Sequence, residues 1–368
     1  MRNTCHSKDA RALRQENFLS GECRRIASPL LFCLLMVLSA LSCSESNGPE
    51  KYIVTTQALS GASWPFFIGV EGGYFDKYGL DVDLRFGRHP AGIAGVSSGD
   101  VLTINIGLDT GLAAASKGGR LVMVGSPVNV GTFVLMGTKE TQDVKELADK
   151  RIAIGRVGDP PYHYTLALFK HLGIRTDNIK WIPSGGAPTR MVTMINGAAD
   201  AALLTAPTYY KLIEEGYPVL VNMSDYREVI IAQAYMFHRD MLENKPDVVE
   251  NFMKAVIDAT HRFYTDKPFA MEAMRQHTNV KDDVTLSQVY DDYFAIEQLE
   301  RIPYIRQDAI ESVVERNSER LPELKDMDFS DMLFSSVLDK LAEEGFFEEI
   351  YGPDIKKELK EAQAAAAR

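Results

Sequence analysis

Along most of the chain, short apolar runs rich in β-branched residues alternate with stretches of helical periodicity. The runs that predict strands are residues 52–56, 80–84, 101–106, 121–125, 151–154, 180–182, 201–204, 219–221 and 230–237. The stretches that predict helices are residues 64–71, 91–98, 110–117, 144–148, 162–172, 189–196 and 207–215. Such alternation builds mostly parallel sheets with helices against their faces. The pattern therefore predicts an α/β fold, followed from residue 239 by a charged helical region.

The clearest helix begins at Trp64, with Pro65 in its first turn, where a missing N–H group costs nothing. Ser63 stands directly before this helix and can cap its first N–H groups. Gly72 and Gly73 follow it, and glycine ends a helix readily because it reaches the left-handed conformation without a steric penalty. These signals predict both ends of the helix.

The first 42 residues have the pattern of a secretory signal peptide. An uncharged apolar run over residues 26–42 follows Arg24 and Arg25, and Cys43 comes directly after it. The residues before Cys43 resemble a lipobox, which predicts cleavage there, lipidation of Cys43 and an extracytoplasmic protein anchored to a membrane. Residues 43–51 would form a polar tether. A membrane-spanning helix is the alternative, although the run is at the short limit for one.

Composition narrows the class of protein. The formal net charge is −11, and an acidic chain is a poor partner for nucleic acid, whose phosphates attract basic surfaces. The four cysteines are Cys5, Cys23, Cys33 and Cys43, so no disulfide can form after Cys43 and the fold depends on core packing. The sequence has no nucleotide-binding, nucleophile-elbow or zinc-protease motif, and its histidines lack the spacing of metal ligands. These observations disfavour catalysis and predict neither cofactor nor metal.

An ordered set of motifs lies between residues 65 and 82. It consists of Pro65, a hydrophobic run to Val70, Glu71, Gly73, Tyr74–Phe75 and Tyr78-Gly79-Leu80-Asp81-Val82. Its order and spacing resemble the "P…A…GFF…GLDV" opening of substrate-binding proteins of ABC importers for sulfonates, nitrate and thiamine precursors. Later segments extend the resemblance over most of residues 52–305.

The resemblance implies a two-lobed periplasmic-binding-protein fold of type II. Each lobe would be a mostly parallel sheet flanked by helices, with the ligand cleft between the lobes and a helical C-terminal region. We expect a first lobe at residues 52–137 and 225–353, a second lobe at 138–224 and a tail at 354–368. The chain would cross between the lobes near residues 137–140 and 222–226, and the extended run 230–237 could return it to the first sheet.

The candidate ligand-binding residues lie at or near the ends of predicted strands, where open α/β sheets bind their ligands. They are Ser60, Trp64, Asn105, Asp109, Thr110, Arg156, Asp159, Tyr162, His163 and Thr205. Several have a purely structural alternative. Asp109 and Asp159 can cap helices, and Thr205 can begin one. His163 can be a local packing residue, and Trp64 can belong to the core instead of stacking on a ligand.

The resemblance implies a monomer that captures a small organic molecule by hinge closure and delivers it to an ABC permease with a cytoplasmic ATPase. With Trp64, Tyr162 and His163 as flat faces, we expect a neutral or weakly cationic heteroaromatic, such as a thiamine-pyrimidine precursor. Asp109 and Asp159 would repel a sulfonate- or nitrate-type anion unless both cap helices. The anion is therefore the alternative ligand.

Two other functions stay open at this point. One is an enzyme similar to thiamine-pyrimidine synthases, although those carry a cysteine-rich motif and this chain has no cysteine after Cys43. The other is a ligand-sensing domain that serves a membrane receptor.

Overall fold

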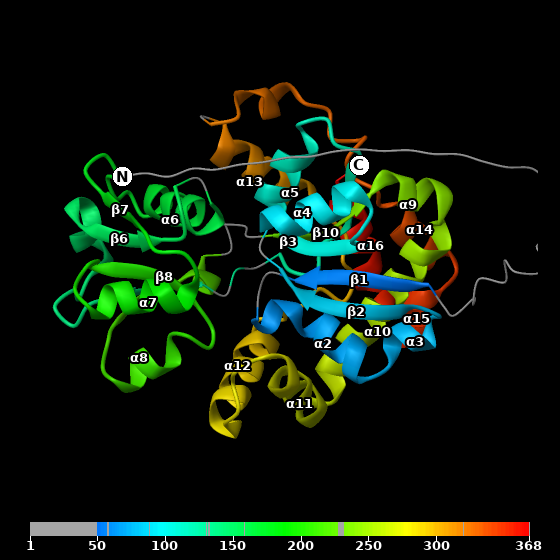
Figure 1. Ribbon diagram of the computed structural model, residues 1–368, viewed down its shortest axis with the longest axis horizontal. Coiled ribbons are helices and arrows are strands. Elements are labelled where there is room, and N and C mark those ends of the chain that lie inside the picture. Colours follow the sequence, from blue (N-terminus) through cyan, green and yellow to red (C-terminus); the bar gives the residue numbers. More distant parts are fainter. Residues whose placement is uncertain are drawn as a thin grey trace, which may run out of the picture. The chain divides into compact units, whose positions relative to one another are not determined.

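The computed structural model describes residues 50–56, 59–87, 89–129, 131, 133–157, 159–226, 232–318 and 320–367. The predicted signal peptide and Cys43 lie outside the described residues. Two five-stranded sheets form the centres of two lobes, and helices flank both sheets (Figure 1). The α/β class predicted from the sequence is confirmed.

The first sheet has the strand order β2-β1-β3-β10-β4. Its strands are β1 (Lys51–Thr56), β2 (Asp81–Phe86), β3 (Thr103–Gly107), β4 (Leu121–Gly125) and β10 (Gln233–His238). Strand β1 pairs in parallel with β2 and β3, whereas β10 lies antiparallel between β3 and β4. The extended run 230–237 therefore does return the chain to the first sheet.

The second sheet has the order β7-β6-β8-β5-β9. Its strands are β5 (Phe133–Gly137), β6 (Arg151–Ile154), β7 (Lys180–Pro183), β8 (Ala201–Thr205) and β9 (Val219–Asn222). Strand β6 pairs in parallel with β7 and β8, and β5 lies antiparallel between β8 and β9. Each sheet is therefore mixed, with one antiparallel strand in the same place, and that strand is the first one that the chain forms after crossing from the other lobe.

The position of β5 corrects the first expected crossing. We expected the chain to leave the first lobe near residues 137–140, but β5 already pairs with two strands of the second sheet. The crossing thus lies between β4 and Phe133. Strand β5 is not among the strands expected from the sequence. Its apolar run also does not reveal which sheet it joins, because its partners β8 and β9 follow more than sixty residues later in the sequence.

Helices cover both faces of the first sheet (Figure 1). On one face lie α4 (His89–Ser98), α5 (Leu108–Ala115) and α13 (Gln307–Asn317), and on the other lie η1 (Gly61–Ser63), α2 (Trp64–Glu71), α3 (Tyr74–Lys77) and α10 (Pro246–Thr265). The glycine signal after α2 is confirmed, since Gly73 is left-handed with φ +66°. Ser63 does not cap α2 with its side chain, because its Oγ pairs with Thr56 Oγ1 at 2.7 Å.

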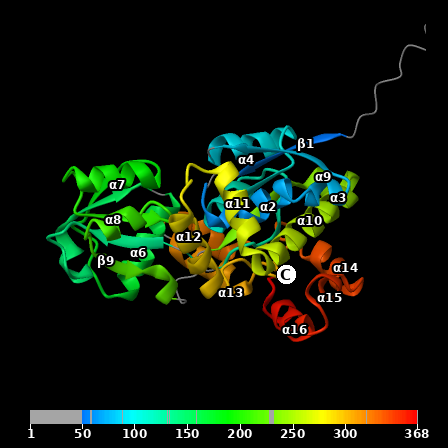
Figure 2. The same ribbon diagram turned by 90° about the horizontal axis from the view of Figure 1, so that it is seen from below.

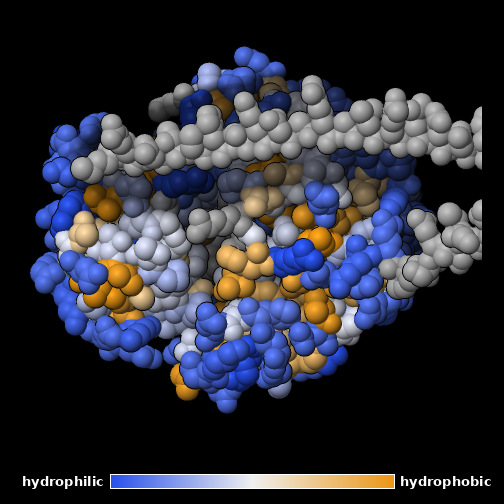
Figure 3. All heavy atoms as spheres, viewed as in Figure 1, coloured by the Kyte–Doolittle hydropathy of each residue, from blue (hydrophilic) through white to orange (hydrophobic). Residues whose placement is uncertain are grey.

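The second sheet has α6 (Pro160–His171) against one face and α7 (Ala187–Ile195) against the other (Figure 2). Its shorter elements are η2 (Val144–Asp149), α8 (Tyr210–Glu214) and η3 (Met223–Asp225). The helix expected at 144–148 is a 3-10 helix, and the one expected at 207–215 is shorter, as α8. Most of the surface in Figure 3 is hydrophilic, with apolar groups over α7, where Val192 and Ile195 are exposed.

The C-terminal region is helical, as predicted. Its remaining elements are α9 (Arg239–Asn244), α11 (Lys267–His277), α12 (Asp283–Ala295), η4 (Pro322–Asp326), α14 (Ser336–Glu343), α15 (Phe346–Tyr351) and α16 (Ile355–Ala365). The expected tail forms a packed helix, because Ile355 and Leu359 of α16 are buried in the core of the first lobe. Within the described part of the chain, no helix is both long and apolar enough to cross a membrane.

Candidate ligand-binding site

The two lobes approach each other at the edges where the parallel strands end. A Cβ atom at Gly107, the last residue of β3, would lie 3.4 Å from Tyr164 Oη and 3.7 Å from Pro160 Cγ of α6. Helix α6 of the second lobe therefore lies within van der Waals reach of the end of β3. Ligands of open α/β sheets bind outside such strand ends, so this junction is the candidate site.

In the first lobe, the predicted site residues Ser60 and Asn105 lie in a buried polar cluster. The carbonyl of Ser60 accepts a hydrogen bond from Ser63 N at 3.0 Å, and Asn105 Nδ2 donates to the carbonyl of Ala62 at 3.2 Å. Asn105 Oδ1 is buried and has no hydrogen-bond partner among the described residues. Ser60 and Asn105 thus hold the turn into α2 against the end of β3. Trp64 follows directly in the same turn.

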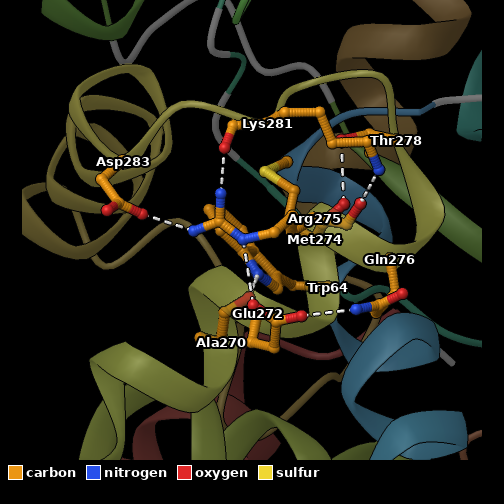
Figure 4. Close-up of polar contacts among 9 residues, drawn as sticks. All are labelled: Trp64, Ala270, Glu272, Met274, Arg275, Gln276, Thr278, Lys281 and Asp283. Atoms are coloured by element: carbon orange, nitrogen blue, oxygen red, sulfur yellow. Dashed lines mark hydrogen bonds and ion pairs between the residues drawn. The ribbon is translucent and has the colours of Figure 1, made fainter.

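Trp64 belongs to the core, which corrects the expectation that it stacks on a ligand. Its side chain is fully buried, with ring centroids 4.9 Å from Phe263 and 5.4 Å from Tyr293. Its indole N–H donates to the carbonyl of Ala270 at 2.7 Å, in the contact drawn in Figure 4. Both the faces and the polar edge of the ring are therefore occupied by the protein itself.

Asp109 is paired and does not cap α5. The residue before α5 is Gly107, and the buried carboxylate of Asp109 accepts hydrogen bonds from Arg316 Nη2 at 3.0 Å and Asn317 Nδ2 at 2.9 Å. Burial alone would lower the pKa of Arg316, but the attraction of Asp109 outweighs it and the pKa is raised. The negative charge of Asp109 is thus neutralised by a residue 207 positions away in the sequence.

In the second lobe, Asp159 caps the N-terminus of α6, which was the alternative to a ligand-binding role. Its carboxylate accepts hydrogen bonds from Tyr162 N at 3.1 Å and Arg156 N at 2.8 Å at the start of α6. Burial raises the pKa of the Asp159 carboxyl, and the two N–H groups partly counter that rise. The Asp159 side chain is therefore committed to the backbone of its own lobe.

The other predicted residues of the second lobe differ in exposure. The Arg156 side chain is exposed, whereas His163 is buried on α6. Tyr162 packs edge-on against Trp181 with ring centroids 4.8 Å apart, so its ring serves the second lobe's own packing. Thr205 ends β8 and is half-buried.

A pocket of about 190 Å³ lies between the two lobes and brings three predicted residues together. Its lining is Ile93, Asp109, Thr110, Ala113, Ala114, Lys117, Pro160, His163 and Arg320. The two basic residues were not predicted. Lys117 follows Asp109 at helical spacing, so the sequence could have placed these two residues on one side of a helix. No local sequence signal connects Arg320 to α5. Among the described residues, no group of His, Cys, Asp or Glu side chains is placed to hold a metal ion.

Two of the C-terminal helices of the first lobe contact the second lobe. Lys170 of α6 forms an ion pair with Glu315 of α13 at 2.6 Å, and the Arg316 guanidinium lies 5.7 Å from the centre of the Tyr164 ring. Elsewhere, Tyr210 Oη donates to Asp292 Oδ2 of α12 at 2.5 Å. These contacts join the second lobe to helices that belong to the first.

The family model that matches this chain is described as NMT1/THI5 like, and it covers residues 61–268. This match spans more than half of the sequence. The chain belongs to the NMT1/THI5-like family. The resemblance seen in the motifs between residues 65 and 82 is thereby confirmed, because the matched region contains them.

Two binding proteins are among the proteins to which this NMT1/THI5-like chain is similar, one by sequence and one by fold. It is 27% identical over 186 residues to the taurine-binding periplasmic protein of Escherichia coli (strain K12), covering 49% of this chain and 57% of that protein. It thus spans little more than half the length of this curated relative. The alkanesulfonate-binding protein SsuA of Xanthomonas axonopodis pv. citri, solved with bound MOPS, superposes with a TM-score of 0.62 at 15% identity, covering 79% of this chain and 99% of SsuA.

The same fold also occurs in an enzyme. A mutant of DszB, solved in complex with biphenyl-2-sulfinic acid, superposes with a TM-score of 0.63 at 14% identity and covers 81% of this chain and all of DszB. At such identities these two structures establish the fold alone. The two-lobed periplasmic-binding-protein fold expected from the sequence is confirmed.

Proposed function

We propose that this protein is the extracytoplasmic solute-binding component of an ABC importer. It would capture a small organic molecule between its lobes and deliver it to the membrane permease. The observation that carries the proposal is the pocket lined by α5 of the first lobe and α6 of the second, because a molecule bound there contacts both lobes at once. A ligand with such contacts favours the closed arrangement over an open one.

For the ligand, we favour a sulfonate-type organic anion over the heteroaromatic suggested by the sequence. Trp64 is in the core and cannot stack on a ring. Asp109 is paired with Arg316, and Asp159 caps α6, so neither carboxylate is left to repel an anion. The relatives whose names include taurine and alkanesulfonate support the same class of ligand.

Calorimetric titration tests both parts of this proposal. Taurine, ethanesulfonate, nitrate and a thiamine-pyrimidine precursor are titrated into the protein, and small-angle scattering is recorded with each compound that binds. We expect the sulfonates to bind and the radius of gyration to stay at, or fall to, that of the closed form at saturation. Binding of the pyrimidine alone would overturn the ligand class, and failure of the whole panel would contradict the importer function.

We propose binding instead of catalysis even though DszB shares the fold. The two carboxylates at the junction are engaged in an ion pair and a helix cap, which leaves neither as a general base. No cysteine follows Cys43 in the sequence, so a cysteine nucleophile is also missing from this region.

We also propose that Cys43 carries a lipid anchor, on the strength of the apolar run and small residues before it. Cys43 lies outside the described residues, so chemistry must provide the test. Cells that express the protein are labelled with a fatty acid analogue, and we expect label in the wild type and none in Cys43→Ala. Equal labelling of both proteins would contradict the anchor.

A further inference from the structure

We propose that the pocket between α5 and α6 is an oxyanion site in which Lys117 and Arg320 hold the acidic group of the solute. This inference rests on the proposed function and deepens it, because it assigns the charged end of the ligand to particular residues. The pocket lies where α5, α6 and the turn after α13 meet. Helix α13 itself contacts both α5 and α6.

The charges that line the pocket favour an anion. Its lining contains one carboxylate, Asp109, whose charge is balanced by the buried guanidinium of Arg316 at 3.0 Å. Lys117 and Arg320 therefore give the pocket lining a net positive charge, although the formal net charge of the chain is −11. A concave site with one sign of charge concentrates ions of the opposite sign. Thr110 adds a hydroxyl donor to the same lining.

Arg320 is positioned by a buried hydrogen-bond network. Its Nη2 donates to Asn317 Oδ1 at 2.7 Å, and the fully buried Asn317 donates through Nδ2 to Asp109 Oδ1 at 2.9 Å. The Asn317 side chain that donates to Asp109 thus also fixes the direction of Arg320. A guanidinium has five N–H donors in a planar fork, so the bond to Asn317 leaves donors for the oxygens of a sulfonate, sulfate or phosphate group.

The pocket is complete only when the lobes are together. Thr110 and Lys117 belong to the first lobe, whereas Pro160 and His163 belong to the second. Opening of the lobes would separate these two walls and also break the ion pair between Lys170 and Glu315 on the same side. An anion held in this pocket would therefore stabilise the closed arrangement through contacts that the open one lacks.

The test is calorimetric titration of Lys117→Gln and Arg320→Gln with ethanesulfonate and, separately, with inorganic sulfate. Ethanesulfonate carries an acidic group and no ammonium, so it isolates the interaction proposed here. We expect each substitution to weaken ethanesulfonate binding about tenfold, the scale of one lost charge-assisted hydrogen bond. Added NaCl should weaken wild-type binding in the same direction. The exposed residues Lys357 and Arg175 provide matched controls, since Lys357→Gln and Arg175→Gln remove the same charges elsewhere.

The outcomes separate this site from the function on which it rests. Ethanesulfonate binding that is equally strong in Lys117→Gln, Arg320→Gln and the controls overturns the oxyanion site and leaves the importer function standing. Binding of sulfate without ethanesulfonate would make the pocket a site for inorganic ions and overturn its role toward a solute. If the wild type binds ethanesulfonate and both variants lose affinity while the controls do not, the assignment holds.

Discussion

Replacing Trp64 with alanine is expected to lower the free energy of unfolding by about 3–5 kcal/mol, the range found when a large buried aromatic side chain is removed from a core. The ring is fully buried and touches Phe263 and Tyr293, so alanine would leave a cavity between helices of the first lobe. It would also leave the carbonyl of Ala270 without the indole donor. Urea unfolding of the two proteins provides the measurement.

Trp64→Phe serves as the control, because it keeps most of the ring and loses only the indole N–H and some volume. We expect its loss of stability to be smaller than that of Trp64→Ala. Both variants should bind ethanesulfonate with wild-type affinity while folded. A stable Trp64→Ala protein with weakened ligand binding would show that the ring faces the ligand after all.

The second large effect is a pH dependence that originates at Glu300. Its backbone N–H donates to the carbonyl of Pro127 at 2.9 Å, and its carboxyl is hydrogen-bonded to Asn129. The segment from Pro127 to Asn129 precedes β5, so Glu300 contacts the chain shortly before its first strand in the second sheet. Burial raises the pKa of Glu300 from 4.5 to about 7, against the lowering effect of Asn129, Arg306 and Arg301.

This shift means that the folded protein keeps a proton on Glu300 that the unfolded chain has already lost between pH 4.5 and about 7. The contribution of Glu300 to stability is therefore fully present below pH 4.5 and is lost as the pH rises to about 7. Its full size is about 3 kcal/mol, from 1.36 kcal/mol for each pKa unit. Glu300→Gln, which resembles the protonated form, should be more stable than the wild type at pH 8 by up to this amount and similar to it at pH 4.5.

Denaturant unfolding of Glu300→Gln and the wild type at both pH values provides the comparison. Glu361→Gln is a suitable control, because Glu361 is an exposed carboxyl on α16. Equal stability of Glu300→Gln and the wild type at pH 8 would mean that Glu300 ionises without cost in the folded protein.

Local sequence signals predicted the structural features that depend only on residues close together in the chain. The start of α6 is an example, because Asp159 and the prolines that follow it form a cap within a few residues. The role of Trp64 could not be decided in this way, since its helical position is compatible with either a core or a ligand. The rings that enclose it, Phe263 and Tyr293, come from the C-terminal helices.

The same limit explains two further features that the sequence did not predict. The partner of Asp109 is Arg316, which lies in a helix far along the chain, so the carboxylate looked like a cap or a ligand group. Strand β5 has an apolar pattern that suits either sheet, and only its pairing with β8 and β9 assigns it to the second lobe. When a residue's partners lie far along the chain, its role can be assigned only once the fold is known.

The place of β10 has a consequence for the order in which the chain can acquire its structure. The second sheet is built from one continuous stretch, Phe133 to Asn222, so it can be completed as soon as that stretch is available. The first sheet cannot be completed so early, because β10, which lies between β3 and β4, ends only at His238. In a polypeptide synthesised from its N-terminus, the first lobe therefore begins to form first but is completed last. Until then, β3 has an unpaired edge and β4 has no partner strand in the sheet, which leaves both open to misassociation.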